Sequence, residues 1–250
     1  MNKHQASFRG GWQSENLARY ILSNFAFIAQ PSTIADDLGS DFFCTIFDTV
    51  PNGNNSDLVP KESFAIQIKS STRLIDISGK IEYLKGLEIP FFVGVCKKEK
   101  QELELYSGEY LIPFFVDNPS ARAIKIKLCE MDNCKGILSS DKNNEFTVNF
   151  PIVDTIGSNP DCPQFKEVVQ KLSRICRTVS GNITRRNNKE YIFTDSFSGK
   201  LLLVSNGQLV KQSIDVRLQK IFHELAYILQ ERHIDTDLEK YNRIRDALSP

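Results

Sequence analysis

The segment "SFAIQIKSS", residues 63–71, has the alternation of a β-strand. Its bulky apolar side chains, Phe64, Ile66 and Ile68, fall on one face, because successive side chains of a strand point to opposite sides. Gln67 and Lys69 share the other face. An amide and an ammonium therefore lie side by side in an apolar neighbourhood. Such a pair is either a solvated strand edge or part of a site that binds something.

The segments around this strand predict an α/β core. Aromatic and β-branched runs indicate strands, apolar residues at helical spacing indicate helices, and Gly and Pro mark their ends. The stretch before residue 63 contains Pro-Asn-Gly and further turn formers, so a long hairpin loop is expected there. The predicted order is helix, strand, strand, helix, strand and strand, at residues 13–25, 40–48, 63–71, 78–90, 91–98 and 102–108.

Farther along, two more strands are expected before the composition changes. Linker residues gather at 154–163, which places a domain boundary after residue 153. This gives a first domain over 1–153 and a smaller, mostly α module over 154–250. The module is expected to contain a helix ending at Gly181, a strand pair and two amphipathic helices. The corresponding segments are 123–130, 145–151, 163–181, 190–195, 200–205, 215–232 and 235–249.

The composition narrows the possible functions. The chain has 250 residues, 41% of them hydrophobic, with 31 basic and 31 acidic side chains, so overall charge gives it no affinity for nucleic acid and any such contact must be focused. Three histidines supply little for zinc or histidine catalysis. The six cysteines form no CxxC and are expected to be reduced, neither ligands nor bridges. No signal peptide or membrane span is expected, which predicts a cytoplasmic protein.

Glu15, Asp41 and the Gln67/Lys69 pair are the polar groups that an apolar pattern does not explain. Glu15 lies on the apolar stripe of the first helix, although it could also be a first-turn acid with Ser14 as the cap. Asp41 opens a strand after Gly and Ser, at an end that could face a cleft, although an aspartate there is often a turn residue. No single one of these residues decides the function.

Their order along the chain is informative. A helix carrying Glu15, a strand carrying Asp41, a strand carrying Gln67-Ile68-Lys69 and then a helix resemble the PD-(D/E)XK nuclease superfamily. The glutamine is similar to the branch of Mrr-like restriction endonucleases and Holliday-junction resolvases, and to uncharacterised bacterial nuclease-like domains linked with phage defence. The resemblance covers about residues 8–116. It implies a restriction-endonuclease-like core, a mixed central sheet flanked by helices, within the first domain.

The resemblance also implies a divalent-metal-dependent endonuclease that hydrolyses DNA phosphodiester bonds, in bacterial defence or DNA processing. Mg²⁺ or Mn²⁺ would be held by Asp41, the Gln67 side-chain oxygen and the Ile68 main-chain carbonyl, with Glu15 at a second metal or a metal-bound water. Lys69 would position the attacking water or balance charge on the phosphate. The expected partners are DNA, with RNA also possible, a second copy of the chain and a partner protein of a defence system.

Glutamine in place of a carboxylate lowers the negative charge of the site and is expected to weaken its metal affinity. The alternative is therefore a catalytically inactive nuclease-fold module that binds nucleic acid or protein. A third possibility is an α/β protein in which these residues never meet. Asp36 and Asp37 are rival ligands, interpreted as loop acids. Candidate phosphate contacts are Arg9, Arg73 and the runs "CKKEK" (96–100) and "ITRRNNK" (183–189).

Overall fold

The computed structural model describes most of the first 194 residues and a few beyond them. Its contacts divide the chain into two compact units, Met1–Thr184 and Arg185–Pro250. The described residues are 3–31, 39–53, 55–130, 138–140, 145–159, 164–194, 201–205, 220, 221, 224 and 227, and side chains are described for all of these except 3–10, 138–140, 164, 193–194 and 201–205.

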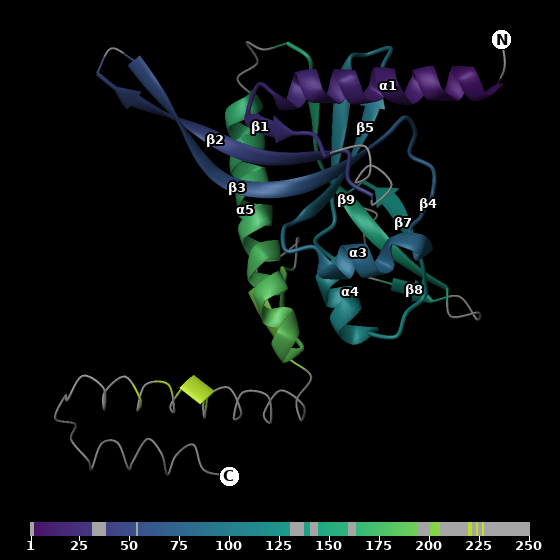
Figure 1. Ribbon diagram of the computed structural model, residues 1–250, viewed down its shortest axis with the longest axis vertical. Coiled ribbons are helices and arrows are strands. Elements are labelled where there is room, and N and C mark those ends of the chain that lie inside the picture. The colour runs from purple at the N-terminus through teal and green to yellow at the C-terminus, as the bar shows by residue number, and fades with distance from the viewer. Residues whose placement is uncertain are drawn as a thin grey trace. The chain divides into compact units, whose positions relative to one another are not determined.

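In the first unit, the described strands form one mixed nine-stranded sheet (Figure 1). β3 pairs with β5 in parallel and β7 pairs with β9 in parallel, whereas the other pairings are antiparallel. The order is β1 (Ala26–Ala29), β2 (Phe42–Asn52), β3 (Asn55–Lys69), β5 (Phe91–Lys97), β6 (Glu102–Ser107), β9 (Glu145–Gly157), β7 (Ala123–Cys129) and β4 (Ile75–Asp76), with β8 (Leu138–Ser140) beside β9. The expected α/β class with a mixed central sheet is confirmed.

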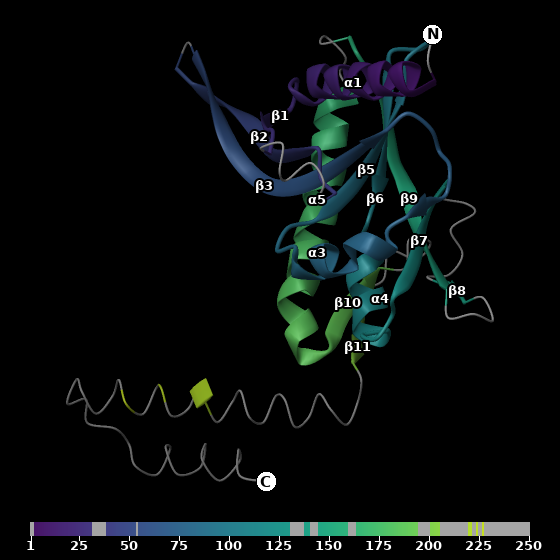
Figure 2. The same ribbon diagram turned by 45° about the vertical axis from the view of Figure 1, so that its right-hand side comes forward.

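Helices pack on this sheet and bury its apolar face. The apolar side of α1 (Lys3–Leu22) and that of α5 (Gln164–Arg185) contact one continuous cluster with β1, β2, β3, β5 and β6. Figures 1 and 2 show α1 lying across one end of the sheet. In this cluster Phe64 and Phe92 meet edge to face with ring centroids 5.0 Å apart. The remaining helical elements are η1 (Ser78–Lys80), α3 (Ile81–Gly86) and α4 (Leu111–Asp117).

The β2–β3 hairpin differs from its prediction. Instead of a long loop, the two strands continue and pair as far as Asn52 with Asn55, and Gly53 turns the chain with a φ of +59°. Asn-Gly is a strong short-range hairpin signal, and β-formers such as Val50 and Val59 extend the ladder despite the neighbouring prolines. The expectation of a long loop is therefore wrong. The hairpin projects from the body of the unit in both ribbon views (Figures 1 and 2).

Other predicted elements have the predicted type but different ends, whereas β1, β4, α4 and β8 were not predicted. α1 begins at Lys3 rather than near Gln13, β9 runs to Gly157, and α5 continues past Gly181 because Asn182 and Ile183 are still buried. β9 therefore passes through the stretch interpreted as a linker. The division between the units comes after Thr184 rather than after residue 153, because the end of β9 pairs with β6 and α5 packs on the core of the first unit.

The second unit contains a small strand pair. β10 (Glu190–Thr194) and β11 (Leu201–Ser205) pair antiparallel after η3 (Arg186–Asn188), which confirms the predicted pair. The amphipathic helix expected at 215–232 is helical at the four residues described within it. The rest of that segment, and the helix expected at 235–249, lie outside the described residues.

The cysteines divide into two groups. Cys44, Cys96 and Cys176 are free and buried, and burial raises their pKa values to about 12, about 11 and about 12. Cys129, at the end of β7, is disulfide-bonded. The expectation of no bridge is wrong at this position, since a disulfide requires only a suitable approach of two Cβ atoms and no CxxC motif.

None of the helices in the described ranges combines the length and the apolar composition that a membrane span requires.

Candidate functional site

Asp41 stands directly before β2 and is fixed to β3 through two hydrogen bonds. Its N–H donates to the carbonyl oxygen of Ile66 at 2.8 Å, and its Oδ2 accepts a hydrogen bond from the N–H of Ile68 at 2.5 Å. The Asp41 carboxylate thus gives β3 one more hydrogen-bond acceptor, just before the first residue of β2. Asp41 therefore lies against the Gln67-Ile68-Lys69 segment.

The residues before Asp41 hold it in place. Gly39 has a φ of +118°, which L side chains rarely adopt, and its backbone lies so close to Lys80 that an added Cβ would be 2.9 Å from Lys80 Cδ. The hydroxyl of Ser40, which is buried, lies 2.8 Å from that of Tyr83 on α3. Gly39 and Ser40 therefore position Asp41. The glycine lets the chain turn, and the serine docks the turn on the helix that follows β3.

We expect Gly39→Ala to lower the free energy of unfolding by about 1–3 kcal/mol, because alanine has to adopt a strained backbone conformation there. Urea unfolding would measure the change. Gly79→Ala is the matched control, since an added Cβ at Gly79 meets nothing within 4 Å. Equal unfolding midpoints for the two variants would contradict the interpretation.

The main-chain carbonyl of Ile68 points to the same edge as Asp41. The N–H of Ala65 donates to the carbonyl oxygen of Pro90 on the β5 side, at 2.8 Å. On the other side, the Ile66 carbonyl accepts from the Asp41 N–H, and the Ile68 N–H donates to the Asp41 carboxylate. Main-chain groups of alternate residues in a strand point to opposite neighbours, and the N–H and C=O of one residue point the same way. The Ile68 carbonyl oxygen is thus beside the Asp41 carboxylate.

Gln67 lies on the sheet face opposite Phe64, Ile66 and Ile68, as the alternation predicts. It is only 6% exposed and sits next to Val93 in the β3–β5 register. Its side chain lies on the same face of β3 as that of Lys69.

Lys69 interacts electrostatically with the other charged groups of the site. Burial lowers the pKa of its ammonium, the attraction of Asp41 and of Glu15 raises it, and repulsion from Lys80 lowers it further, with a net result below the ordinary value. All three of these charged neighbours are therefore within electrostatic reach of Lys69. We call Glu15, Asp41, Gln67, Ile68 and Lys69 the Asp41 site.

Glu15 reaches the site from the middle of α1. Because the helix begins at Lys3, the alternative of a first-turn acid capped by Ser14 is wrong. Ser14 is buried, and its carbonyl oxygen accepts a hydrogen bond from the Cys96 thiol at 3.0 Å, which fixes this part of α1 on β5. Glu15 itself is partly buried.

The oxygen groups of the site are two carboxylates, one amide and one main-chain carbonyl. Over the part of the chain that the structure describes, no three His, Cys, Asp or Glu side chains gather as a metal-binding group. The donor set at the Asp41 site is thus poor in charge, as the glutamine predicts. Hard cations such as Mg²⁺ accept such neutral oxygen donors and keep several waters.

The other candidates lie elsewhere. Asp36, Asp37 and the side chain of Arg9 fall outside the described residues. Arg73 is exposed in the turn after β3. In "CKKEK" (96–100) the cysteine is buried and the first lysine pairs with Glu104 at 3.2 Å, and "ITRRNNK" (183–189) lies at the end of α5.

Two residues lie near the site although no sequence motif predicts their position there. Lys80 follows Gly79 in a polar stretch, and Tyr83 occupies an ordinary helical position. Their place beside Asp41 depends on how α3 returns the chain from β3 to β5, which local periodicity does not encode. Lys80 adds a second cation to the Asp41 site.

No family model, curated protein or solved structure matches this chain.

Proposed function

We propose that the chain is a divalent-metal-dependent endonuclease with a restriction-endonuclease-like core, related to the PD-(D/E)XK superfamily. The observation that carries the proposal is the hydrogen bond from the Ile68 N–H to Asp41, which puts an acid against the Gln-x-Lys segment. Lys69 responds electrostatically to Asp41 and to Glu15, so the charged members of the predicted motif share one neighbourhood.

The topology supports the same proposal. After α1 with the glutamate and the short β1, an antiparallel strand pair has Asp41 and Lys69 at adjacent ends, and β4, η1 and α3 then lead to β5, parallel to β3. Apart from the short β1 and β4, this is the element order on which the resemblance rests. The long β2–β3 hairpin and the extension of the sheet through β9, β7 and β4 would be additions to such a core.

The residues present fit a hard divalent cation. Asp41, the Gln67 side-chain oxygen and the Ile68 carbonyl would hold Mg²⁺ or Mn²⁺, and Glu15 would bind a second ion or a coordinated water. When bound, the ion supplies positive charge for the developing phosphorane and lowers the pKa of water. The amide in place of an acid makes a millimolar metal requirement the expected behaviour.

Lys69 supplies a positioned cation. Its depressed pKa reflects a charge held away from bulk water, and a preorganised charge in such surroundings stabilises a transition state more strongly than one in solvent. Lys69 would orient the attacking water or face the phosphate. Lys80, on the other side of the Gly39 turn, would extend the positive region toward the substrate backbone.

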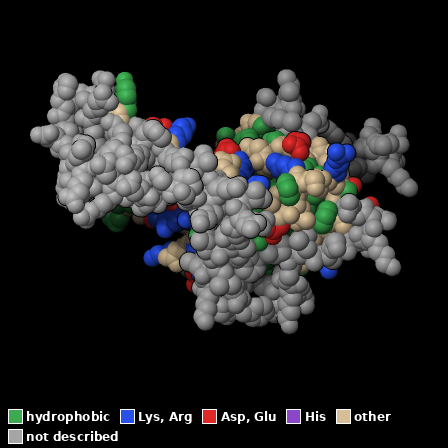
Figure 3. Space-filling view, turned by 90° about the horizontal axis from the view of Figure 1, so that it is seen from below, with side chains coloured by type: hydrophobic (Ala, Val, Ile, Leu, Met, Phe, Trp, Pro, Cys, Tyr) green, Lys and Arg blue, Asp and Glu red, His purple; other side chains and the backbone are tan. Residues whose placement is uncertain are grey.

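DNA is the proposed substrate, and RNA would present the same phosphate chemistry. A homodimer would supply two sites for two strands, and the C-terminal unit would serve dimerisation, target recognition or regulation, with bacterial defence or DNA processing as the setting. The described surface in Figure 3 mixes Lys and Arg with Asp and Glu, so binding would depend on local grooves rather than on overall charge.

Plasmid nicking tests the proposal. We expect the wild-type chain to nick supercoiled plasmid with millimolar Mg²⁺ or Mn²⁺, to stop when EDTA is added, and to lose about 10²-fold or more of its rate in Asp41→Asn. Asp57→Asn, the same change at the exposed hairpin tip, should cut like the wild type.

The outcomes separate the alternatives. Equal nicking by the wild type and Asp41→Asn would indicate a contaminating nuclease and oppose the assignment. Binding of DNA with no cutting under any metal would favour the inactive nuclease-fold module instead.

A further inference from the structure

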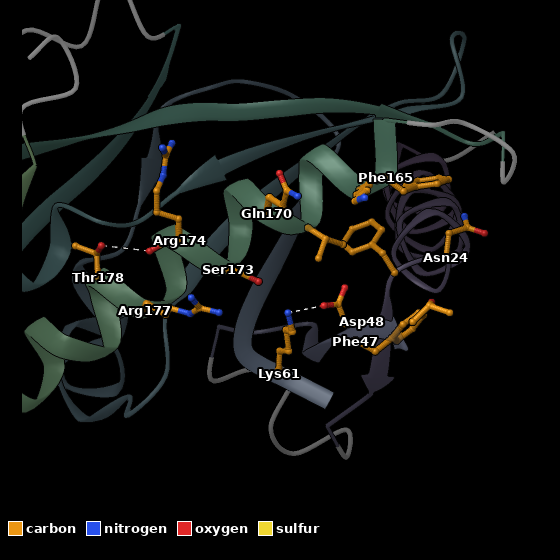
Figure 4. Close-up of a pocket in the computed structure, with 14 residues that line it drawn as sticks. Asn24, Phe47, Asp48, Lys61, Phe165, Gln170, Ser173, Arg174, Arg177 and Thr178 are labelled. Atoms are coloured by element: carbon orange, nitrogen blue, oxygen red, sulfur yellow. Dashed lines mark hydrogen bonds and ion pairs between the residues drawn. The ribbon is translucent and has the colours of Figure 1, made fainter. Parts of the chain in front are cut away.

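A second concave site lies away from the Asp41 site, between α5 and the β2–β3 hairpin. We call it the α5 groove; its volume is about 680 Å³, within the range of small-molecule sites. Figure 4 shows its walls: one comes from α5, the other from β2 and β3, with the end of α1 at one side. It is lined by Asn24, Phe25, Phe47, Asp48, Thr49, Lys61, Phe165, Lys166, Val169, Gln170, Ser173, Arg174, Arg177 and Thr178.

The α5 groove is predominantly positive. Four of its lining residues are cationic, and Asp48 is the one carboxylate among them. Asp48 pairs with Lys61 at 2.5 Å, and Arg177 is bound at 2.5 Å to Glu62, just outside the groove. Those pairs fix two of the cations in place.

The other two cations are Lys166 and Arg174, neither of which forms a close ion pair with a described residue, although Arg174 lies near enough to Glu109 to offset part of the rise that burial causes in the pKa of that carboxyl. They lie eight residues apart on α5, with Gln170 midway, so all three are on one face of the helix. At 1.5 Å per residue, this row extends over about 12 Å. Its spacing and charge suit a chain of phosphates rather than a single anion.

One end of the groove, next to Lys166, is aromatic. In Figure 4, Phe47 and Phe165 lie at one end and Arg177 lies toward the other, pointing at Lys61 between them, whereas the Arg174 side chain points away from Lys61. Phe47 also packs on the half-exposed Phe27, with ring centroids 4.9 Å apart, so its ring is held in place. An aromatic surface next to a row of cations matches the two parts of a nucleotide, its base and its phosphate.

We propose that the α5 groove binds nucleotide units, with a base against Phe47 and phosphates along Lys166 and Arg174. The nucleotide comes from a single-stranded nucleic acid or from a free nucleotide, which present the same chemistry. The inference does not depend on cleavage at the Asp41 site. Asp48 is seven residues beyond Asp41 on the same strand, or about 23 Å along it, so the two sites can be altered separately.

The test measures binding by fluorescence anisotropy of a labelled 12-nucleotide oligo(dT), in EDTA so that metal-dependent cutting cannot interfere. Lys166→Glu combined with Arg174→Glu is expected to weaken binding at least about tenfold and to reduce the steepness of log K against log salt by about 1.4, the value for two lost phosphate contacts on a single strand. Phe47→Leu should weaken binding about fivefold or more through lost stacking.

The matched control reverses two exposed charges elsewhere on the first unit, Arg122→Glu with Lys127→Glu. It should bind like the wild type. If both double variants weaken binding equally, the contact is a nonspecific charge effect and the proposal is overturned. Wild-type binding that is unaffected by the groove changes overturns it as well.

Competition identifies the source of the nucleotide. Unlabelled oligo(dT) that displaces the probe, when ATP and inorganic phosphate do not, supports a nucleic-acid strand as the ligand. Displacement by ATP at a similar nucleotide concentration supports a free nucleotide. Asp41→Asn should keep groove binding, so a chain that binds but never cuts refutes the nuclease proposal alone, and a chain that cuts without using the groove refutes this one alone.

Discussion

Lys69→Met is expected to lower the rate of plasmid cleavage at saturating DNA by about 10²–10³-fold, the effect of removing one preorganised charge from a transition state. DNA affinity should change by no more than about threefold, because the ammonium acts mainly on the charge that develops in the reaction. Single-turnover rates and anisotropy binding curves measure the two quantities. Methionine keeps the length and apolar stem of the side chain, so loss of packing is small.

The same variant is expected to be more stable than the wild type at neutral pH. Burial lowers the pKa of Lys69 below its unfolded value of 10.5, so the charged lysine opposes folding at every pH below its folded-state pKa. Wild-type stability rises with pH between the folded and unfolded pKa values as the amine loses its proton. The advantage of Lys69→Met in urea unfolding at pH 7 should therefore shrink as the pH approaches 10.5.

Lower stability at pH 7 together with full activity would contradict both parts of this prediction. Lys127→Met is the matched control. Lys127 is exposed on β7 and belongs neither to the Asp41 site nor to the α5 groove. It should cut short DNA duplexes at the wild-type rate and show no gain in stability.

Phe64→Ala is expected to lower the free energy of unfolding by about 3–5 kcal/mol. Phe64 is fully buried three residues before Gln67, and its ring meets that of Phe92 on β5. Removing it leaves a cavity between β3 and the helices on that face, and breaks an aromatic pair. Urea unfolding followed by far-UV circular dichroism measures the loss, and a variant that unfolds at the wild-type midpoint would contradict the assigned core.

Phe27→Ala provides the comparison for Phe64→Ala. Its ring is 46% exposed and packs mainly on Phe47, so its loss should lower the free energy of unfolding by about 1 kcal/mol. If the two variants lose similar stability, burial does not account for the contribution of Phe64.

Alternation and helical periodicity predicted the types of the elements well where apolar side chains repeat regularly. Phe64, Ile66 and Ile68 are buried on one face, as expected, because a one-sided apolar strand has one favourable orientation. The ends of elements were less accurate. Pro51 and Pro60 suggested a loop, but proline is tolerated at the outer part of a hairpin where few ladder hydrogen bonds are needed.

The candidate site was predictable only in its residue types. The order Glu15, Asp41 and Gln-x-Lys placed the side chains on three successive elements, and the structure brings the charged ones within electrostatic reach. The Asp41 hydrogen bond to Ile68 and the approach of Lys80 depend on strand register and on the path of α3. No sequence motif predicts the α5 groove, because its two walls are more than a hundred residues apart in the sequence.

The Asp41 hydrogen bond makes formation of the candidate site part of folding itself. A slip of one residue between β2 and β3 would turn Gln67 and Lys69 into the apolar interior and leave Asp41 without the Ile68 amide. Misaligned chains would thus carry no competent centre, and burying an uncompensated ammonium would make them unstable. For the nuclease proposed above, a misaligned nascent copy would therefore be inactive.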